Sequence, residues 1–569
     1  MSRIGRSPSE QGKSTAAAAP ADRVRELLGE FDTPGACAAD LLCDRHPADA
    51  VAFTVVESDL SSHDLTYGQL RRDSARFAAA LADLGIGPGD AVATLMGKSA
   101  DLIVALLGIW RRGAVHVPLF TAFAPPAIAL RLKASKAKAV VVDTDQLGKL
   151  APGDGMPVRP PWVIVVAGGS ADEHALSFGA LLSRYTGDEP QGRAVARGGD
   201  GALVLLFTSG TTGAPKGVPV PVRALASFQA YLEYGLDVRP DDVFWNAADP
   251  GWAYGLYYAV LGPLAAGTRS LLLHAGFSAG LTWRVMRQFG VTNFAAAPTV
   301  YRSLRAADEP VPEGLRLRRA SSAGEPLTPE VISWSERELG VAVHDQYGQS
   351  EHGMVIVNGW ADDVRRPVRP GAMGRPLPGW STEVLHAERD EPAAPGTRGR
   401  IAINVVDSPL MWFHGYADAP DKTAERFTSD ARWYLTGDVG SKDEDGLYSF
   451  SARDDDVIIM AGYRIGPFDV ESVLMQDDRV VEAAVVGVPD ALRGEVLEAY
   501  VVLRADTPTG DELVGELKEL VKRKFAAHAY PRAVHFVDRL PKTSSGKIQR
   551  YVLRELRKQT PAGSAPHPS

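Results

Sequence analysis

Short apolar runs alternate with helical patterns along most of the chain, and no other feature of the sequence restricts the fold as strongly. Each run is too short for a helix and is bounded by turn residues, as expected of a strand buried on both faces. The clearest runs are 91–96, 138–143, 162–168 and 202–207. Such strands, when separated by helices, predict an α/β fold in which helices cover parallel or mixed sheets.

The helices are bounded by recognisable capping residues. Thr66 and Gln69 form a T-x-x-Q capping box before an alanine-rich amphipathic run that should end near Gly85. Another helical pattern follows the first strand run and ends at Gly113. Residues 250–268 carry no charge over a length close to that of a membrane span, but they contain two prolines and four glycines. They predict a buried turn and helix instead of a span.

The composition of the chain changes after Asp438. The charged segment 441–456 is followed by a second block of strand and helix patterns, about a hundred residues long, which is a common domain size. Low-complexity sequence lies at both ends. We therefore expect a disordered leader at 1–22, a large N-terminal domain at 23–454, a small α+β C-terminal domain at 455–560 and a disordered tail at 561–569.

Composition excludes several classes of protein. The 70 acidic residues exceed the 61 basic ones, and the net charge of −9 argues against a nucleic-acid binder. Cys37 and Cys43 are too few for a disulfide framework, and no histidine spacing completes a zinc site. The N-terminus lacks the continuous apolar core of a secretory signal. We expect a cytoplasmic protein without a transmembrane segment, either a monomer or a homodimer.

The segment LLFTSGTTGAPKGV, residues 205–218, is the strongest chemical signal. A buried strand opens there into a loop in which glycines allow close approach of the backbone, hydroxyls donate hydrogen bonds and Lys216 supplies positive charge. The loop residues are Thr208, Ser209, Gly210, Thr211, Thr212 and Gly213. The order differs from that of a Walker A loop. This composition predicts a polyphosphate-binding loop, and a Ser/Thr/Gly surface linker is the alternative.

Further segments give the chain a family resemblance. RASSAGEP, DQYGQSEHG, YLTGDVG, ARDDDVIIMAGYRIGPFDVES and LPKTSSGKIQR follow the loop in order. Together they resemble the adenylate-forming acyl-CoA synthetase superfamily. ADPGWAYG and HAYPRAVHFVDR look most similar to the acetyl- and medium-chain branch. The resemblance implies an AMP-forming ligase that uses ATP, Mg²⁺ and coenzyme A to convert a small carboxylic acid, through an acyl-adenylate, into acyl-CoA.

The resemblance also assigns roles around the nucleotide. It places Tyr347 on the adenine ring, Ser350 on the α-phosphate and Glu351 on Mg²⁺, a hard cation that takes carboxylate oxygen. Asp438 would accept both ribose hydroxyls, with Arg453 as its partner. The remaining nucleotide-binding residues implied are Gly324, Glu325, Pro326, Asp345, Gln346, Gly348 and Arg464. Considered singly, each of these side chains would more often be a turn residue or a solvated polar group.

By the same resemblance the C-terminal domain is mobile. Asp455 matches the hinge, although the run of three aspartates at 454–456 leaves an ambiguity of one residue. Lys547 would enter the active site for the first half-reaction, where an ammonium stabilises charge on the carboxylate and α-phosphate. After rotation, coenzyme A would meet Ala461, Gly462 and Tyr463, together with Lys522, for which a solvated helix face is the alternative.

By the same resemblance, Lys547 corresponds to the lysine at which related enzymes are acetylated and inactivated. A lysine acetyltransferase and a deacetylase are therefore candidate partners, since acetylation removes the charge of the lysine.

The acyl pocket departs from the pattern of acetate-specific relatives. They carry tryptophan where this chain has Gly348, and valine where it has Ala253 and Ala323. Trp252, Tyr254 and Gly324 would complete the pocket, although Tyr254 can also lie on the coenzyme A side. These changes favour a medium-chain, branched or aryl acid, since each buried methylene contributes about 0.8 kcal/mol.

Two other readings remain open at this point. The acceptor of the acyl group can be a carrier-protein thiol, an amine or another nucleophile instead of coenzyme A. A non-catalytic nucleotide-binding regulator is a third reading, and the intact loop, Glu351, Asp438 and Lys547 argue against it.

Overall fold

The computed structural model describes residues 19–153, 155–169, 175–208, 215–307, 309–460, 463–490, 493–526, 529–543 and 547–559. Most of the expected leader and the whole expected tail lie outside these residues. Helix α1 (Pro20–Phe31) nevertheless includes the last three residues of the predicted leader, which was expected to end at 22. That boundary was wrong because Pro20 suits a first helical turn and the helix buries Val24, Leu27 and Phe31.

A seven-stranded sheet contains the strand runs that the sequence predicts. Its order is β7-β6-β5-β3-β4-β8-β9, parallel except for the β8–β9 hairpin. The strands are β3 (Ala91–Leu95), β4 (Val115–Pro118), β5 (Ala139–Asp143), β6 (Val163–Ala167), β7 (Leu176–Ser177), β8 (Ala202–Thr208) and β9 (Lys216–Pro221).

A nine-stranded mixed sheet lies across the helices from the first. Its order is β16-β15-β14-β13-β12-β10-β11-β1-β2, with parallel strands in the middle and antiparallel pairs at both edges. The strands are β1 (Val51–Glu57), β2 (Ser62–Thr66), β10 (Phe244–Asn246), β11 (Ser270–His274), β12 (Asn293–Ala296), β13 (Arg319–Ala323), β14 (His344–Gln349), β15 (Gly353–Val357) and β16 (Arg375–Pro376).

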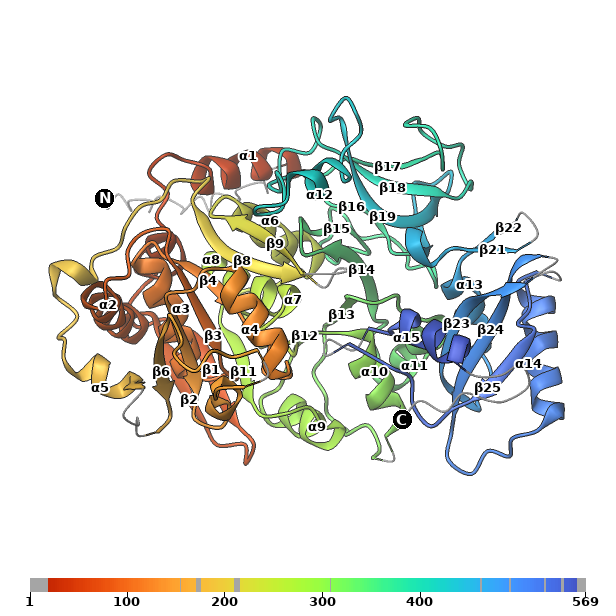
Figure 1. The fold of residues 1–569 in the computed structure, drawn as a ribbon, viewed down its shortest axis with the longest axis horizontal. Coiled ribbons are helices and arrows are strands. Elements are labelled where there is room, and N and C mark those ends of the chain that lie inside the picture. Colours follow the sequence, from red (N-terminus) through yellow and green to blue (C-terminus); the bar gives the residue numbers. More distant parts are fainter. Residues whose placement is uncertain are drawn as a thin grey trace, which may run out of the picture.

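Two smaller sheets complete the described strands. The first is antiparallel, β17 (Thr382–Leu385), β18 (Gly399–Asn404), β19 (Trp433–Lys442) and β20 (Tyr448–Arg453). The second comprises β21 (Ile458–Met460), β22 (Tyr463–Ile465), β23 (Val480–Asp490), β24 (Gly494–Leu503) and β25 (Ala533–Phe536). With helices α13–α15 this last sheet forms a small domain, shown in blue at the right of Figure 1; the other three sheets belong to the large domain.

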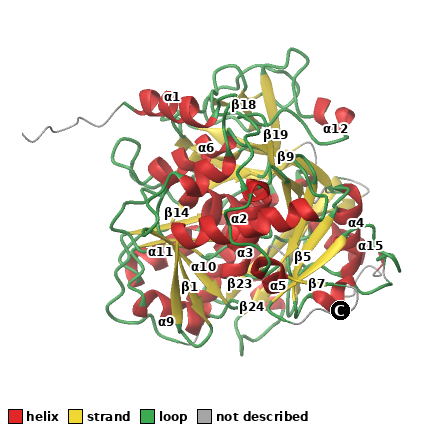
Figure 2. Cartoon of the chain, turned by 90° about the vertical axis from the view of Figure 1, so that its left-hand side faces the viewer, coloured by secondary structure: helices red, strands yellow, loops and turns green. Residues whose placement is uncertain are grey.

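Helices pack between and around the sheets, as the sequence predicts. Figure 2 shows α2 and α3 in the middle of the molecule, with β1 on one side and β5 and β7 on the other. The helices of the large domain are α1, α2 (Tyr67–Asp83), α3 (Ala100–Arg111), α4 (Pro125–Ala134), α5 (Phe178–Ser183), α6 (Ala224–Ala230), α7 (Ala253–Gly255), α8 (Gly262–Ala266), α9 (Ala279–Gln288), α10 (Pro298–Ala306), α11 (Pro329–Glu338) and α12 (Pro420–Ala424). Those of the small domain are α13 (Pro467–Leu474), α14 (Asp511–Lys524) and α15 (Arg550–Gln559).

Short helical turns of other types punctuate the chain. Those in π-helical form are η1 (Asp40–Asp44), η4 (Tyr231–Gly235) and η5 (Leu256–Leu261). Those in 3₁₀ form are η2 (Leu147–Leu150), η3 (Pro190–Gly192) and η6 (Asp454–Asp456). Two of the π-helical turns, η4 and η5, lie behind the candidate site described below, as such turns often do.

The local predictions are confirmed in detail. The Thr66 hydroxyl caps α2, and the Gln69 side chain accepts from the Thr66 amide at 2.8 Å, which closes the capping box. Gly85 and Gly113 follow α2 and α3 with φ of 74° and 69°, in the left-handed region that glycine adopts without strain. The uncharged segment 250–268 folds as α7, η5 and α8, and no helix within the described residues is long and apolar enough to cross a membrane.

Candidate active site

The predicted phosphate loop closes the β8–β9 hairpin. Thr208 at the end of β8 pairs with Lys216 at the start of β9, and the intervening residues Ser209, Gly210, Thr211, Thr212 and Gly213 lie outside the described residues. The Lys216 ammonium sits 4.9 Å from the centre of the Tyr416 ring. Desolvation and the nearby charge of Arg426 lower the pKa of Lys216, while Glu351 opposes that shift. Lys216 is thus held beside Glu351.

A hairpin of β14 and β15 presents the DQYGQSEHG motif. The register shifts between Tyr347 and Gly348, and the turn carries Ser350 and Glu351. Tyr257, on η5, donates its hydroxyl to the Ser350 carbonyl at 2.9 Å. Tyr416 donates to Glu351 Oε1 at 2.8 Å, and that carboxylate is 8% exposed. Two tyrosines from distant segments therefore fix the turn and aim its carboxylate.

Asp438 is the centre of a second cluster. Strands β19 and β20 pair it directly with Arg453, whose Nη1 donates to Asp438 Oδ1 at 2.9 Å. The Oδ2 atom accepts from the Tyr347 hydroxyl at 2.5 Å and from Gln349 Nε2 at 2.6 Å. Asp438 itself is 4% exposed. The carboxylate that the motif assigns to ribose is therefore held in place by Arg453, Tyr347 and Gln349.

The SAGEP turn leaves β13 beside these residues. Gly324 has φ of 102°, which glycine adopts without strain, and its position faces the Trp252 ring, 3.3 Å from where a β-carbon would stand. Glu325 follows and accepts from Thr299 Oγ1 at 2.9 Å and from Arg302 Nη2 at 2.5 Å. Both donors lie on α10. Pro326 is half-buried next to them and completes the turn.

Two residues predicted to bind nucleotide point into the protein interior. Asp345 is 5% exposed, and burial raises the pKa of its carboxyl to about 8, although the amides of Leu327 and Gln346 donate to it. Gln346 is 2% exposed; its Oε1 accepts from the Tyr231 hydroxyl, and its Nε2 donates to the Gly235 carbonyl at 3.2 Å. Their side chains therefore build the wall behind the site.

Lys547 comes from the small domain and meets the motifs of the large one. The residue is exposed, yet enough protein surrounds its ammonium that desolvation, followed by the charge of Arg453, lowers its pKa. Glu325, Asp438 and Glu351 act in the opposite sense. The SAGEP, DQYGQSEHG and YLTGDVG motifs therefore lie near enough to Lys547 of the PKTSSGK motif for their charges to influence its pKa.

Some predicted residues are not brought to this site. Lys522 lies on α14, at the outer edge of the small domain in Figure 1, where its ammonium contacts Glu519 at 2.5 Å and the Tyr530 ring at 4.4 Å. Tyr463 is 54% exposed on the β21–β22 hairpin, in which Arg464 pairs with Ile459. Ala461 and Gly462 lie outside the described residues.

The expected space at Gly348 is filled. A β-carbon on Gly348 would lie 2.2 Å from the Gly353 carbonyl oxygen and 2.6 Å from the Met354 methyl carbon. The absence of a side chain therefore allows the hairpin to close, and Met354 occupies the direction in which we expected a wider pocket. Ala323 and Ala253 are buried as expected, at 0% and 8% exposure.

Tyr254 also turns inward. It is 4% exposed, and its hydroxyl lies 3.1 Å from that of Tyr231, which in turn bonds Gln346. Tyr254 therefore lies in the same interior wall as Tyr231 and Gln346.

Several residues of the site were missed from the sequence. Tyr416 and Arg426 contact Glu351 electrostatically from the segment that follows β18, and Arg426 Nη1 donates to the Thr436 carbonyl at 3.2 Å. Tyr257 lies in the uncharged segment 250–268, where it is one of several aromatic residues. Nothing local distinguishes these side chains from core residues, because the role of each depends on a partner far away in the chain.

Known proteins share this arrangement over nearly the whole chain. The sequence pattern of the AMP-binding enzyme family matches residues 41–416, and that of the AMP-binding enzyme C-terminal domain matches residues 469–547. The acetyl-coenzyme A synthetase of Bacillus subtilis (strain 168) is 34% identical over 511 residues, covering 88% of this chain and 86% of the relative. The mitochondrial acyl-coenzyme A synthetase ACSM3 of Rattus norvegicus is 34% identical over 524 residues, with 88% and 86% covered.

Solved structures agree with these relatives. An acyl-CoA synthetase from Brucella canis is 42% identical, with a TM-score of 0.71 over 96% of this chain and 98% of that one. The anthranilate CoA ligase AuaEII, solved with anthranoyl-AMP, is 26% identical, with a TM-score of 0.83 over 92% and 98%. Their fold has the same large N-terminal and small C-terminal domains. The resemblance seen in the motifs is therefore confirmed: the chain belongs to the adenylate-forming superfamily and is an AMP-forming acyl-CoA synthetase.

Proposed function

We propose that this enzyme activates a medium-chain, branched-chain or aryl carboxylic acid and transfers the acyl group to coenzyme A. The observation that carries the proposal is the buried Asp438 carboxylate, which Arg453, Tyr347 and Gln349 hold in place. The charges of Asp438, Glu325 and Glu351 also act to raise the pKa of Lys547, against desolvation and the charge of Arg453. In the first half-reaction a carboxylate oxygen attacks the α-phosphorus of ATP. The bond between the α-phosphorus and the oxygen that bridges it to the β-phosphate breaks, and pyrophosphate leaves. Lys547 and Lys216 would stabilise the negative charge that is shared among these groups.

Nucleotide recognition would use the cluster around Asp438. Its carboxylate, held by Arg453 and Gln349, is suited to accept the two ribose hydroxyls once the Tyr347 phenol gives way to the nucleotide. Gly324, Glu325 and Pro326 would lie against the adenine, and Ser350 would donate to the α-phosphate. Thr208 and the loop after it would contact the outer phosphates.

Glu351 fits the role of a magnesium ligand. Tyr416 bonds its Oε1, and Oε2 accepts no hydrogen bond from the residues that the structure describes. A hard cation prefers such a carboxylate oxygen. Magnesium, when bound, neutralises phosphate charge, and Tyr416 would orient the carboxylate toward it.

The second half-reaction would follow a rotation of the small domain. The coenzyme A sulfur attacks the acyl carbonyl carbon, and the bond between that carbon and the AMP oxygen breaks. The thiol proton passes to solvent. Ala461, Gly462 and Tyr463 would then approach the site, and Lys522 would stay a candidate contact for coenzyme A phosphates.

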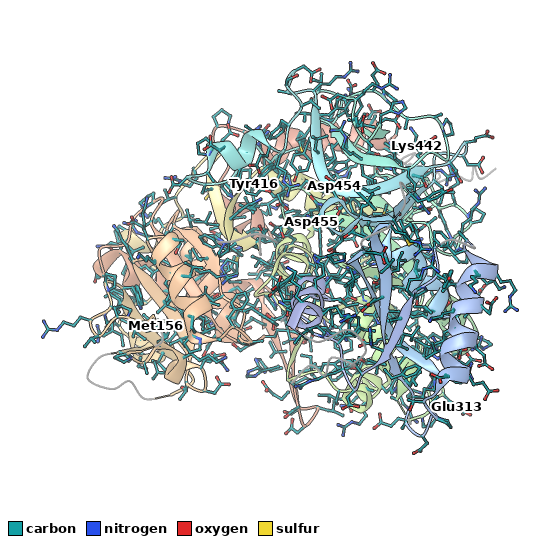
Figure 3. All side chains as sticks on the ribbon, turned by 45° about the vertical axis from the view of Figure 1, so that its right-hand side comes forward. Met156, Glu313, Tyr416, Lys442, Asp454 and Asp455 are labelled. Atoms are coloured by element: carbon teal, nitrogen blue, oxygen red, sulfur yellow. The ribbon has the colours of Figure 1, made fainter. Side chains whose placement is uncertain are left out.

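Contacts on either side of the domain junction narrow the position of the hinge, where Figure 3 labels Asp454 and Asp455. Asp456 is bound by Arg550 and Arg554 of α15, and so moves with the small domain. Asp455 lies 3.9 Å from Arg453 Nε, on the large-domain side. We therefore place the hinge at Asp455 and the end of the N-terminal domain at residue 454.

The acyl specificity rests on the walls of the pocket. Ala253 and Ala323 would leave room that valine would fill, and Met354, next to Gly348, and Trp252, next to Gly324, would supply apolar surface. The AuaEII structure is that of an anthranilate CoA ligase, which favours an aryl acid, and the Bacillus subtilis relative is an acetyl-coenzyme A synthetase. The flexible thioether of Met354 can adapt to several acyl shapes.

Lys547 is also the proposed site of regulation. Acetylation of Lys547 by a lysine acetyltransferase would remove the charge on which adenylation depends. A deacetylase would restore activity. Enzyme acetylated at Lys547 that keeps its adenylation rate would contradict this role.

The test is a panel of acids with the purified enzyme and the Lys547→Ala variant. Pyrophosphate release is measured with acetate, butyrate, hexanoate, octanoate, isobutyrate and benzoate, with and without coenzyme A. We expect coenzyme A-dependent turnover that is highest on an acid larger than acetate and lost in the variant. Turnover on acetate alone would refute the pocket argument, and turnover independent of coenzyme A would indicate a carrier-protein thiol or an amine as acceptor.

A further inference from the structure

The loop that carries Lys547 is fixed at both ends by buried charge. On one side, Lys542 forms an ion pair with Glu482 of β23, and both side chains are largely buried. On the other side, Arg550 begins helix α15 three residues after Lys547. Both ends of the loop are therefore held to the body of the small domain.

The loop is also closed on itself. Lys547 donates its amide to Thr543 Oγ1 at 3.0 Å and accepts the Thr543 amide on its carbonyl at 2.7 Å. The Gln549 amide donates to the Pro541 carbonyl at 2.9 Å. These bonds join the described residues on either side of 544–546, and they connect Lys547 to the segment that leads to Arg550.

Arg550 is clamped by two carboxylates. Its Nη2 donates to Glu471 Oε1 and Oε2 at 2.8 and 2.7 Å, and its Nε donates to Oε1 at 3.1 Å. Its Nη1 reaches Asp456 Oδ2 at 3.3 Å. The three side chains are 17%, 5% and 15% exposed. Glu471 also accepts the Val485 amide at 2.8 Å, which fixes it against β23.

Asp456 connects Arg550 to the domain junction, because it is the last residue of the short helical turn η6 between the two domains. The same guanidinium therefore touches the domain junction, helix α13 through Glu471, and the start of the helix that follows the Lys547 loop. Arginine suits this task because its planar fork presents several donors in fixed directions.

We propose that Arg550 is a positioning residue for Lys547. By binding Glu471 and Asp456 together, it sets the Lys547 loop at a fixed position relative to the junction about which the small domain turns. Docking of the domain then brings the ammonium of Lys547 to Glu325, Glu351 and Asp438. The inference rests on the proposed role of Lys547 in adenylation.

The experiment separates the two half-reactions in the full-length enzyme. Adenylation is measured by ATP–pyrophosphate exchange with butyrate and with benzoate. Thioester formation is measured from supplied butyryl-adenylate and benzoyl-adenylate with coenzyme A, a step that does not use Lys547. The variants are Arg550→Met, Arg550→Lys, Glu471→Gln and Lys547→Ala. The matched control is Arg557→Met, on the same helix, where Arg557 is 17% exposed and pairs with Glu498, 7% exposed, at 2.9 Å.

Arg550→Met should lower the adenylation kcat by about 100-fold, the scale of loss from a misplaced catalytic group. Thioester formation should be preserved, the KM for ATP should change little, and Arg550→Lys should restore part of the rate. Glu471→Gln should lower adenylation in the same selective way, and it provides the test if Arg550→Met does not fold. Arg557→Met should leave the ratio of the two half-reactions unchanged.

Two results would overturn the inference: adenylation by Arg550→Met or Glu471→Gln at the wild-type rate, or an equal loss of both half-reactions in these variants. Lys547→Ala distinguishes this failure from that of the proposed function. If Lys547→Ala loses adenylation and the Arg550 and Glu471 variants do not, only the positioning role fails. If Lys547→Ala retains adenylation, the role proposed for Lys547 itself is wrong.

Discussion

Replacing Tyr416 with phenylalanine removes one atom whose role in catalysis can be calculated. Its hydroxyl donates to Glu351 Oε1 at 2.8 Å in a buried setting, while its ring lies 4.9 Å from the Lys216 ammonium. Phenylalanine keeps the ring contact and deletes the hydroxyl, which bonds Glu351 and also interacts with Arg426. A hydrogen bond to a charged group contributes about 1.5–3 kcal/mol. If the bond holds Glu351 in its productive orientation, kcat/KM for adenylation should fall about 10- to 150-fold.

The assay is ATP–pyrophosphate exchange over a range of Mg²⁺ concentrations, because the proposed purpose of the bond is to present Glu351 to the metal. The variant should need more Mg²⁺ for half-maximal rate, and chelation by EDTA should abolish exchange in both proteins. Tyr434→Phe is the control, since its hydroxyl bonds the neutral Gln349 Oε1 at 3.3 Å and should contribute less. The reasoning is refuted if Tyr416→Phe shows wild-type kcat/KM and the same Mg²⁺ dependence.

Three further predictions concern the acyl pocket, the stability of the fold and the pH profile. In the Met354→Ala variant, kcat/KM should increase by about fourfold for each methylene added between butyrate and octanoate, the equivalent of about 0.8 kcal/mol each. A chain-length profile the same as that of the wild type would contradict this. Gly348→Ala should instead destabilise the fold by about 1–3 kcal/mol, seen as a lower denaturation midpoint, because its β-carbon would overlap the Gly353 carbonyl. Adenylation should fall as pH rises through the pKa of Lys547, since the ammonium carries the charge. Because the site lowers that pKa, the loss of adenylation at alkaline pH should have its midpoint below the ordinary lysine value of about 10.4. The residual activity of Lys547→Arg should not show this loss. A limb at or above that value would argue against the assignment.

Much of the fold was predictable because its signals are local. The capping box of Thr66 and Gln69, the strand runs of β3, β5, β6 and β8, and the glycines that end α2 and α3 each depend on a few neighbouring residues. The start of α1 at Pro20 was missed because the alanine- and proline-rich sequence there has no apolar spacing.

In the site, too, some features were predictable from local sequence and others were not. Lys216, Glu351, Asp438 and Lys547 lie in motifs that could be read directly, and the structure brings their charges together. Met354 overturned the expectation of open space at Gly348, because the register of the β14–β15 hairpin, which no short motif reveals, decides what faces that glycine.

The sequence by itself determined the order of strands and helices and the loop with its lysine, since both depend on composition and spacing along the chain. It also indicated the family, through motifs that resemble those of known members. Tertiary structure alone decided that Tyr416 orients Glu351, that Tyr347 and Gln349 share Asp438, and that Arg550 joins the Lys547 loop to the domain junction. The partners in these contacts are separated by 65 to 94 positions. Hydrogen bonds require approach within about 3 Å. Only the packing of whole sheets and helices brings groups so distant in sequence to that separation.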